Sequence, residues 1–346
     1  MNLRDLLDEA LGDVPQAAAG RCVHERASVA TCHRCVTSCP RDAWQLDDEQ
    51  LMIDIGQCDG CGVCVANCPE GALSQVGVSP EPYAGAPELS LSCERAESDA
   101  VGDWRLPCIH AVGLAWLVSM YRAGLRQIEL DIGNCQTCDR RDDEGLPHSV
   151  ERLNTVLAQR KLPQIALGAR STRPAASGPD DLISRQDGPA LSRRGFLRRM
   201  LSAPPISDFD ESEATTKSLG DCLPPAREGD LALFVPEIDE HRCNGCDACV
   251  RVCCHDALIC EQGPSDAYRI AADACTGCDL CADICDRDAI SVSQDAVVSQ
   301  TKIPLAVGNC KVCGVRFHGP ERGCDSDSLC QVCSRVDHKR NLYQVL

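Results

Sequence analysis

The sequence lacks an apolar run long enough to cross a membrane, since such a helix needs about 20 residues and the best candidate, residues 111–120, is much shorter. It also lacks a secretory signal, because residues 1–11 read as a short acidic, amphipathic helix where a signal has a basic start and an apolar centre. Basic residues are scarce: 34 Lys and Arg stand against 52 Asp and Glu, and the formal charge of -18 argues against nucleic acid as a partner. We therefore expect a soluble, cytoplasmic protein without a membrane span, and peripheral membrane association stays open.

Aromatic residues are also rare, at 3% of the chain, so the apolar cores should be small. The motifs of self-contained enzymes are missing as well, because we find no nucleophile triad, phosphate loop, dinucleotide fingerprint or haem motif. These absences weigh against a self-contained substrate-converting enzyme and leave open whether the chain is a subunit of one.

Cysteine, in contrast, makes up 28 of the 346 residues. Such a density indicates either a disulfide scaffold or metal sites, and repeated C-x2-C spacing without a secretory signal favours metal. Sixteen cysteines form four runs. Three runs, beginning at Cys58, Cys243 and Cys275, have the spacing C-x2-C-x2-C-x3-C, and the fourth has nine residues between Cys22 and Cys32. Three thiolates at this spacing can hold one iron–sulfur cluster, while the fourth cysteine reaches a second cluster.

The runs resemble those of bacterial two-cluster 4Fe-4S ferredoxins and form two such modules, at residues 20–78 and 236–296. The resemblance implies four 4Fe-4S clusters, each held by three cysteines of one run and the fourth of the paired run. Zinc or redox-inert clusters compete with this interpretation, but zinc sites seldom use three successive cysteines two residues apart. The long loop leaves open a three-cysteine cluster without Cys22. The implied ligand sets are Cys39, Cys58, Cys61 and Cys64; Cys22, Cys32, Cys35 and Cys68; Cys243, Cys246, Cys249 and Cys285; and Cys253, Cys275, Cys278 and Cys281.

Several residues around these cysteines are informative. Glycine suits a backbone that curls closely around a cluster, and such glycines are Gly60, Gly62, Gly245 and Gly277. Cys254 and Asp286 stand where the family has proline, and polar neighbours there should lower the potential of the nearby cluster.

Residues 88–168 read as a small α/β unit with a parallel sheet. Strands are expected at 89–92, 127–132 and 164–167, and helices at 109–123 and 147–160. Four cysteines follow strand ends or open a helix and should converge at one sheet edge. The start of the helix should also favour a thiolate at Cys108, the cysteine that opens it. The unit is similar to the small iron–sulfur subunit that links hydrogenase to heterodisulfide reductase, which implies a 2Fe-2S cluster. A 4Fe-4S cluster, zinc or no metal stay open for Cys93, Cys108, Cys135 and Cys138.

The C-terminal residues 304–346 carry two C-x2-C knuckles, which make a tetrahedral four-sulfur site for zinc or a single iron. The first knuckle resembles half a rubredoxin, and structural zinc is the preferred occupant. Cys324 and His318 are substitute ligands. The four expected ligands are Cys310, Cys313, Cys330 and Cys333.

Residues 169–230 read as a linker with a basic segment at Ser192–Arg198. The segment matches a twin-arginine export signal, but no apolar region follows it, so we do not expect export. It also resembles the start of the cytoplasmic ferredoxin-type protein of nitrate reductase operons. That resemblance implies docking to molybdoenzyme precursors through Arg193, Arg194, Arg198 and Arg199.

The sequence therefore predicts an α+β protein with two ferredoxin-like modules flanking an α/β unit, followed by a cysteine-knuckle tail. The expected function is that of a polyferredoxin, an electron-relay subunit of a larger oxidoreductase, whose acidic surface docks on redox proteins or oxidoreductase subunits. Two alternatives stay open: an assembly factor for a molybdoenzyme, and a redox sensor that uses Cys254 or Cys222.

Overall fold

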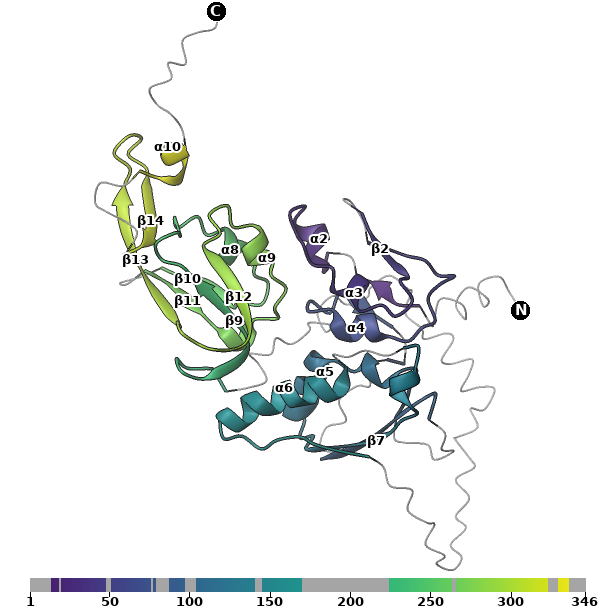
Figure 1. Cartoon of the computed structure of the whole chain (residues 1–346). Helices are drawn as coiled ribbons and strands as arrows, with labels where there is room; N and C mark the ends of the chain where they lie inside the picture. Colours follow the sequence, from purple (N-terminus) through teal and green to yellow (C-terminus); the bar gives the residue numbers. More distant parts are fainter. Residues whose placement is uncertain are drawn as a thin grey trace, which may run out of the picture. The chain divides into compact units, whose positions relative to one another are not determined.

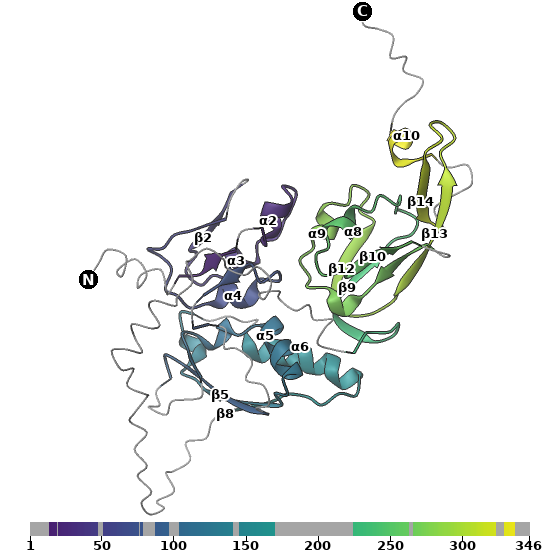
Figure 2. The same ribbon diagram turned by 180° about the vertical axis from the view of Figure 1, so that it is seen from behind.

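The computed structural model describes residues 14–18, 20–47, 51–75, 77–78, 87–96, 104–140, 145–169, 224–262, 266–322 and 329–335. The expected N-terminal helix, the basic segment with its arginines, Cys222 and Cys324 lie outside the described residues. Helices and strands are mixed in the described chain, consistent with an α+β class (Figures 1 and 2). None of the described helices is long and apolar enough to cross a bilayer.

The segment with the first two cysteine runs is built from very short elements. Its helices have four or five residues, well below the roughly 12–15 that an isolated helix needs, so packing must hold them. Trp44 and Leu73 form a small buried core, and Cys35, Cys39 and Cys68 pack against it. Strands β1 and β4 pair antiparallel, as do β2 and β3. The elements are β1 (Gln16–Ala17), α2 (Val23–Arg26), α3 (Arg34–Thr37), β2 (Trp44–Leu46), β3 (Leu51–Ile53), α4 (Val63–Asn67) and β4 (Leu73–Ser74).

The next segment forms a parallel four-stranded sheet in the order β6-β5-β7-β8. Leu89 and Leu91 of β5 pair with Ile128 and Leu130 of β7, and all four side chains are buried. Helices α5 and α6 cover the same face of the sheet (Figures 1 and 2), as two right-handed crossovers in one direction require. The elements are β5 (Glu88–Cys93), β6 (Trp104–Leu106), 3₁₀ helices at Ile109–Ala111 and Cys135–Thr137, α5 (Leu114–Arg122), β7 (Gln127–Asp131), α6 (Leu146–Gln159) and β8 (Ala166–Ala169).

Two features of this unit differ from the sequence-based expectation. The short strand β6 was not expected, because three residues are too few to show an alternating pattern. The helix expected from residue 109 begins only at Leu114. Gly113 has extended backbone and approaches α4 so closely that an added Cβ would collide with the carbonyl of Ala66.

The segment with the second pair of runs has longer strands. Strands β9 and β12 have eight residues each and pair antiparallel along their length. The C-terminal hairpin extends a second sheet, because β13 pairs with β11 and gives the order β10-β11-β13-β14. The elements are β9 (Leu231–Ile238), α8 (Ala248–Val252), β10 (Leu258–Glu261), β11 (Ala267–Ile270), a 3₁₀ helix at Ala272–Ala274, α9 (Leu280–Asp283), β12 (Ile290–Val297), β13 (Lys302–Asn309), β14 (Arg316–Pro320) and α10 (Gln331–Arg335).

The parallel-sheet unit and the second cysteine segment share one apolar core. Leu233 and Phe234 of β9 belong to the same buried cluster as Leu153 of α6. Beside this core, Arg160 forms a two-pronged ion pair with Asp273, with nitrogen–oxygen distances of 2.7 and 3.1 Å. Both side chains are at most 7% exposed, so the pair is fixed in the interior.

Candidate metal centres

In the first module, one cavity is lined by sulfurs from both cysteine runs. The expected backbone curl is present there, since φ is 67° at Gly60 and 77° at Gly62. A Cβ added at Gly62 would lie 2.8 Å from the side chain of Val78, so close packing as well as conformation requires glycine. Three of the sulfurs come from the second run and one from the end of the first: Cys58, Cys61, Cys64 and Cys39.

The remaining cysteines of the first module gather separately. Cys68 ends the second run, yet its neighbours are Cys32 and Cys35 of the first run. Cys35 also has Cys64 of the first group as a neighbour. Cys22 is a neighbour of both Cys32 and Cys35, so the nine-residue loop still returns the chain to this group. The structure thus brings together Cys22, Cys32, Cys35 and Cys68.

The second module repeats this exchange of its last cysteines. Asp247 and Asp279 have φ of 61°, the left-handed conformation that glycine adopts at the corresponding position of the first module; aspartate tolerates it better than most residues. One cavity is lined by Cys243, Cys246, Cys249 and Cys285. The other group consists of Cys275, Cys278, Cys281 and Cys253, the last of which comes from the preceding run.

The thiols in these groups are held in a poorly solvated environment. Burial, together with the nearby sulfur of Cys68, raises the pKa of Cys35 to about 12. Burial likewise raises the pKa of Cys249 and of Cys275 to about 12. Four converging sulfurs in a largely apolar shell fit an iron–sulfur cluster, whose binding must displace the thiol protons.

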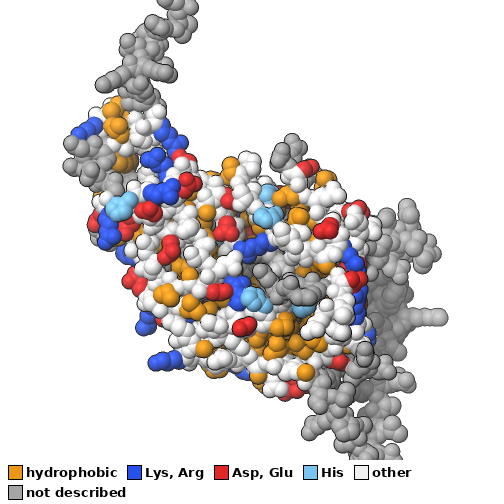
Figure 3. All heavy atoms as spheres, viewed as in Figure 1, with side chains coloured by type: hydrophobic (Ala, Val, Ile, Leu, Met, Phe, Trp, Pro, Cys, Tyr) orange, Lys and Arg blue, Asp and Glu red, His pale blue; other side chains and the backbone are white. Residues whose placement is uncertain are grey.

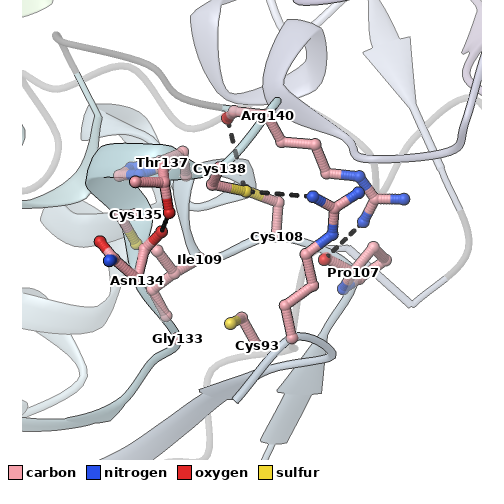
Figure 4. A pocket seen from close by; sticks show the side chains of 12 residues that line it. Cys93, Pro107, Cys108, Ile109, Gly133, Asn134, Cys135, Thr137, Cys138 and Arg140 are labelled. Atoms are coloured by element: carbon pink, nitrogen blue, oxygen red, sulfur yellow. Dashed lines mark hydrogen bonds between the residues drawn. The ribbon is translucent and has the colours of Figure 1, made fainter. Parts of the chain in front are cut away.

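The parallel-sheet unit also brings its four cysteines together. They come from the end of β5, from the turn after Pro107 and from the segment after β7, and they line one cavity of about 240 Å³ (Figure 4). The helix start does not favour a thiolate at Cys108 in the metal-free protein, contrary to expectation: burial raises the pKa of the free thiol to about 11, and the hydrogen bond from the backbone of His110 lowers it too little to compensate. The helix that follows Cys108 is only one 3₁₀ turn, so its dipole is small. The four residues are Cys93, Cys108, Cys135 and Cys138.

The four cysteines of the tail lie closer together than those of the other sets. All four sulfurs are within 4.8 Å of one another, and the sulfurs of Cys313 and Cys330 are 3.6 Å apart. Zinc–sulfur bonds of 2.3 Å in a tetrahedron require a sulfur–sulfur distance of about 3.8 Å, so the group fits a single ion. Backbone N–H groups of Cys313 and Cys330 lower the pKa of Cys310 to about 6. His318 is not needed as a substitute ligand and instead contacts Asp247 at 2.8 Å.

Two polar groups were not expected from the sequence; one consists of Asp247, Cys260 and His318, and the other contains Glu70. Glu70, Cys254 and His255 place their ligand atoms within 4.8 Å of one another, although 184 residues separate the first two. Burial would raise the pKa of Glu70, but hydrogen bonds from His255 and Thr276 and the charge of His255 lower it to about 2. No local sequence signal joins residues so far apart in the chain.

Comparison with known proteins identifies part of this arrangement. A family model described as a 4Fe-4S dicluster domain matches residues 30–73, which include all cysteines of the first module except Cys22. A search of curated proteins finds no significant match. The chain therefore carries a ferredoxin-type iron–sulfur module, whose chemistry is electron transfer.

Proposed function

We propose that the protein is a polyferredoxin, which relays electrons through several iron–sulfur clusters as a subunit of a larger oxidoreductase. The observation that carries this proposal is the exchange of last cysteines between paired runs, which is present in both modules. Two-cluster ferredoxins require this exchange, whereas independent zinc knuckles do not. The dicluster match over the first module supports the same assignment.

Each of the four sets would hold one 4Fe-4S cluster, which when bound takes up and releases single electrons. The protein's own groups adjust the sulfur ligands. Cys39, Cys68 and Cys285 each accept a hydrogen bond from the backbone N–H four residues later, at 3.4, 3.2 and 3.2 Å. Such N–H···S bonds withdraw charge from sulfur and favour the reduced state.

The other two cysteine sets have different proposed roles. The sulfurs around the 240 Å³ cavity would hold a fifth iron–sulfur cluster, beside the guanidinium groups of Arg95 and Arg140. The tail would hold structural zinc, because four thiolates close the shell of the ion and leave no position for chemistry.

The proposed partners are redox proteins in the cytoplasm. On the face that Figure 3 shows, acidic and basic side chains are interspersed. Because neither sign of charge forms a patch of its own on this face, the net charge of -18 would act as a long-range field. This field would steer the chain toward basic partner surfaces.

Iron, sulfide and zinc analysis of anaerobically purified protein, combined with EPR of the reduced state, tests the proposal. Four 4Fe-4S clusters predict about sixteen irons per chain, and a 2Fe-2S cluster in the parallel-sheet unit would add about two. Fewer than about ten irons after full reconstitution would reject four complete clusters.

A further inference from the structure

The side chain of Glu70 stands at a junction between the two ferredoxin modules. It lies two residues after Cys68 and is 4% exposed. Within its own module it accepts a hydrogen bond from Arg26 Nη1 at 2.9 Å. From the second module it accepts hydrogen bonds from three residues: His255 Nε2 at 3.0 Å, Thr276 Oγ1 at 2.8 Å and Cys254 Sγ at 3.3 Å.

A metal ion is a poor occupant for this group, although carboxylate, thiol and imidazole are all metal ligands. The guanidinium of Arg26 is 2.9 Å from Glu70 and 3.3 Å from the sulfur of Cys254, so a cation would face a fixed positive charge. Both carboxylate oxygens of Glu70 are also already used as acceptors. The group is therefore a buried hydrogen-bonded ion pair, and removal of one member would leave an uncompensated charge.

The junction lies directly between two cysteine sets. Thr276 and Cys254 are the sequence neighbours of Cys275 and Cys253, which belong to one set of the second module. Further bonds cross at the same place: Arg34 Nη2 donates to the carbonyl of Gly277 at 2.7 Å, and Thr31 Oγ1 donates to Asp283 at 2.8 Å. The set that contains Cys68 in the first module is thus adjacent to the set that contains Cys253 in the second.

The other set of each module, which does not adjoin the junction, has a neighbour of its own. The set with Cys58 adjoins the parallel-sheet unit, since Asp59 accepts a hydrogen bond from Arg140 at 2.8 Å and Cys61 shares a buried cluster with Cys108. The set with Cys243 adjoins the tail, since Gln331 donates to the carbonyl of Asn244 at 3.3 Å.

We infer that Glu70 is a positioning residue that fixes the two modules as one relay, in which the cysteine sets follow a single linear order. This inference rests on the proposed function. The order begins at the parallel-sheet unit and passes through the sets of Cys58, Cys68, Cys253 and Cys243. The first site in this order is the 240 Å³ cavity of the parallel-sheet unit. A partner that exchanges electrons at this end of the order would bind to the parallel-sheet unit.

The test compares Glu70→Gln and Arg26→Met with wild type and with the control Glu261→Gln. Glu261 also accepts from an arginine, Arg269, but this pair is more than 40% exposed. Anaerobic hydrogen exchange with mass spectrometry is measured on the full chain. We expect exchange to rise at least tenfold in residues 26–34 and 252–257 in both test variants, and to stay unchanged in residues 127–131 and in the control.

EPR of the dithionite-reduced protein gives the second readout. Spin–spin splitting between clusters of different modules should weaken in both test variants while the iron content stays at the wild-type value. Unchanged exchange in both variants would overturn the inference that Glu70 fixes the two modules together. A second zinc ion, besides that of the tail, that binds stoichiometrically to wild type and is lost in His255→Gln would also overturn it. Low iron in wild type would reject the proposed function, whereas the exchange data would still decide whether Glu70 joins the modules.

Discussion

Cysteine variants made singly and in pairs should lose iron in steps that report which sulfurs share a cluster. Cys64 and Cys68 belong to one run but lie in different sets, whereas Cys35 and Cys68 belong to different runs but lie in one set. Each single variant should lose about four of the sixteen or so irons that the four 4Fe-4S clusters would hold. The pair C35A/C68A should lose no more than either single variant, because both changes destroy one cluster. The pair C64A/C68A should lose about eight.

Iron and sulfide analysis after anaerobic reconstitution measures these losses, and EPR spin counts provide an independent value. Cys260→Ala is the matched control, because this thiol is half-buried in the second module and lies outside the four sets. It should lose no iron. The opposite pattern, with about eight irons lost in C35A/C68A and four in C64A/C68A, would show that each run holds its own cluster. That result would refute the exchanged sets.

Three further predictions address stability and the other two sites. Asp273→Asn should lower the free energy of unfolding by about 3–5 kcal/mol, because it leaves the guanidinium of Arg160 buried and unpaired. The control Asp295→Asn, in a more exposed ion pair with Arg152, should lower it by less than about 1 kcal/mol. Anaerobic urea titrations measure both values, and equal effects would contradict this prediction. Cys313→Ser should remove about one zinc per chain by mass spectrometry and leave the iron unchanged; loss of iron instead would mean that the tail holds iron. Cys108→Ala should remove about two irons and leave about sixteen, and an unchanged iron count would exclude a cluster at this site.

Much of the architecture could be predicted from the sequence because it depends on local patterns. Strands β5 and β7 of the parallel-sheet unit follow from alternating apolar residues, and both lie within one residue of the expected bounds. Convergence of Cys93 and Cys108 follows from a general rule about the edge of a parallel sheet. Cysteine spacing predicted a ferredoxin-type module, which the family match over residues 30–73 supports. Ligation of individual clusters stays a prediction.

Tertiary structure decided what depends on contacts between distant segments. The pKa of Cys108 is set by burial, which no local pattern reveals. The pairing of β13 with β11 joins the tail to the sheet of the second module. Arg26 and Glu70 meet Cys254 across more than 180 residues, because packing brings their modules together. The sequence by itself predicted which cysteines would hold metal, because the spacing of ligands within a run is local. The order in which those sites adjoin depends on packing between distant segments, so only the folded chain establishes it.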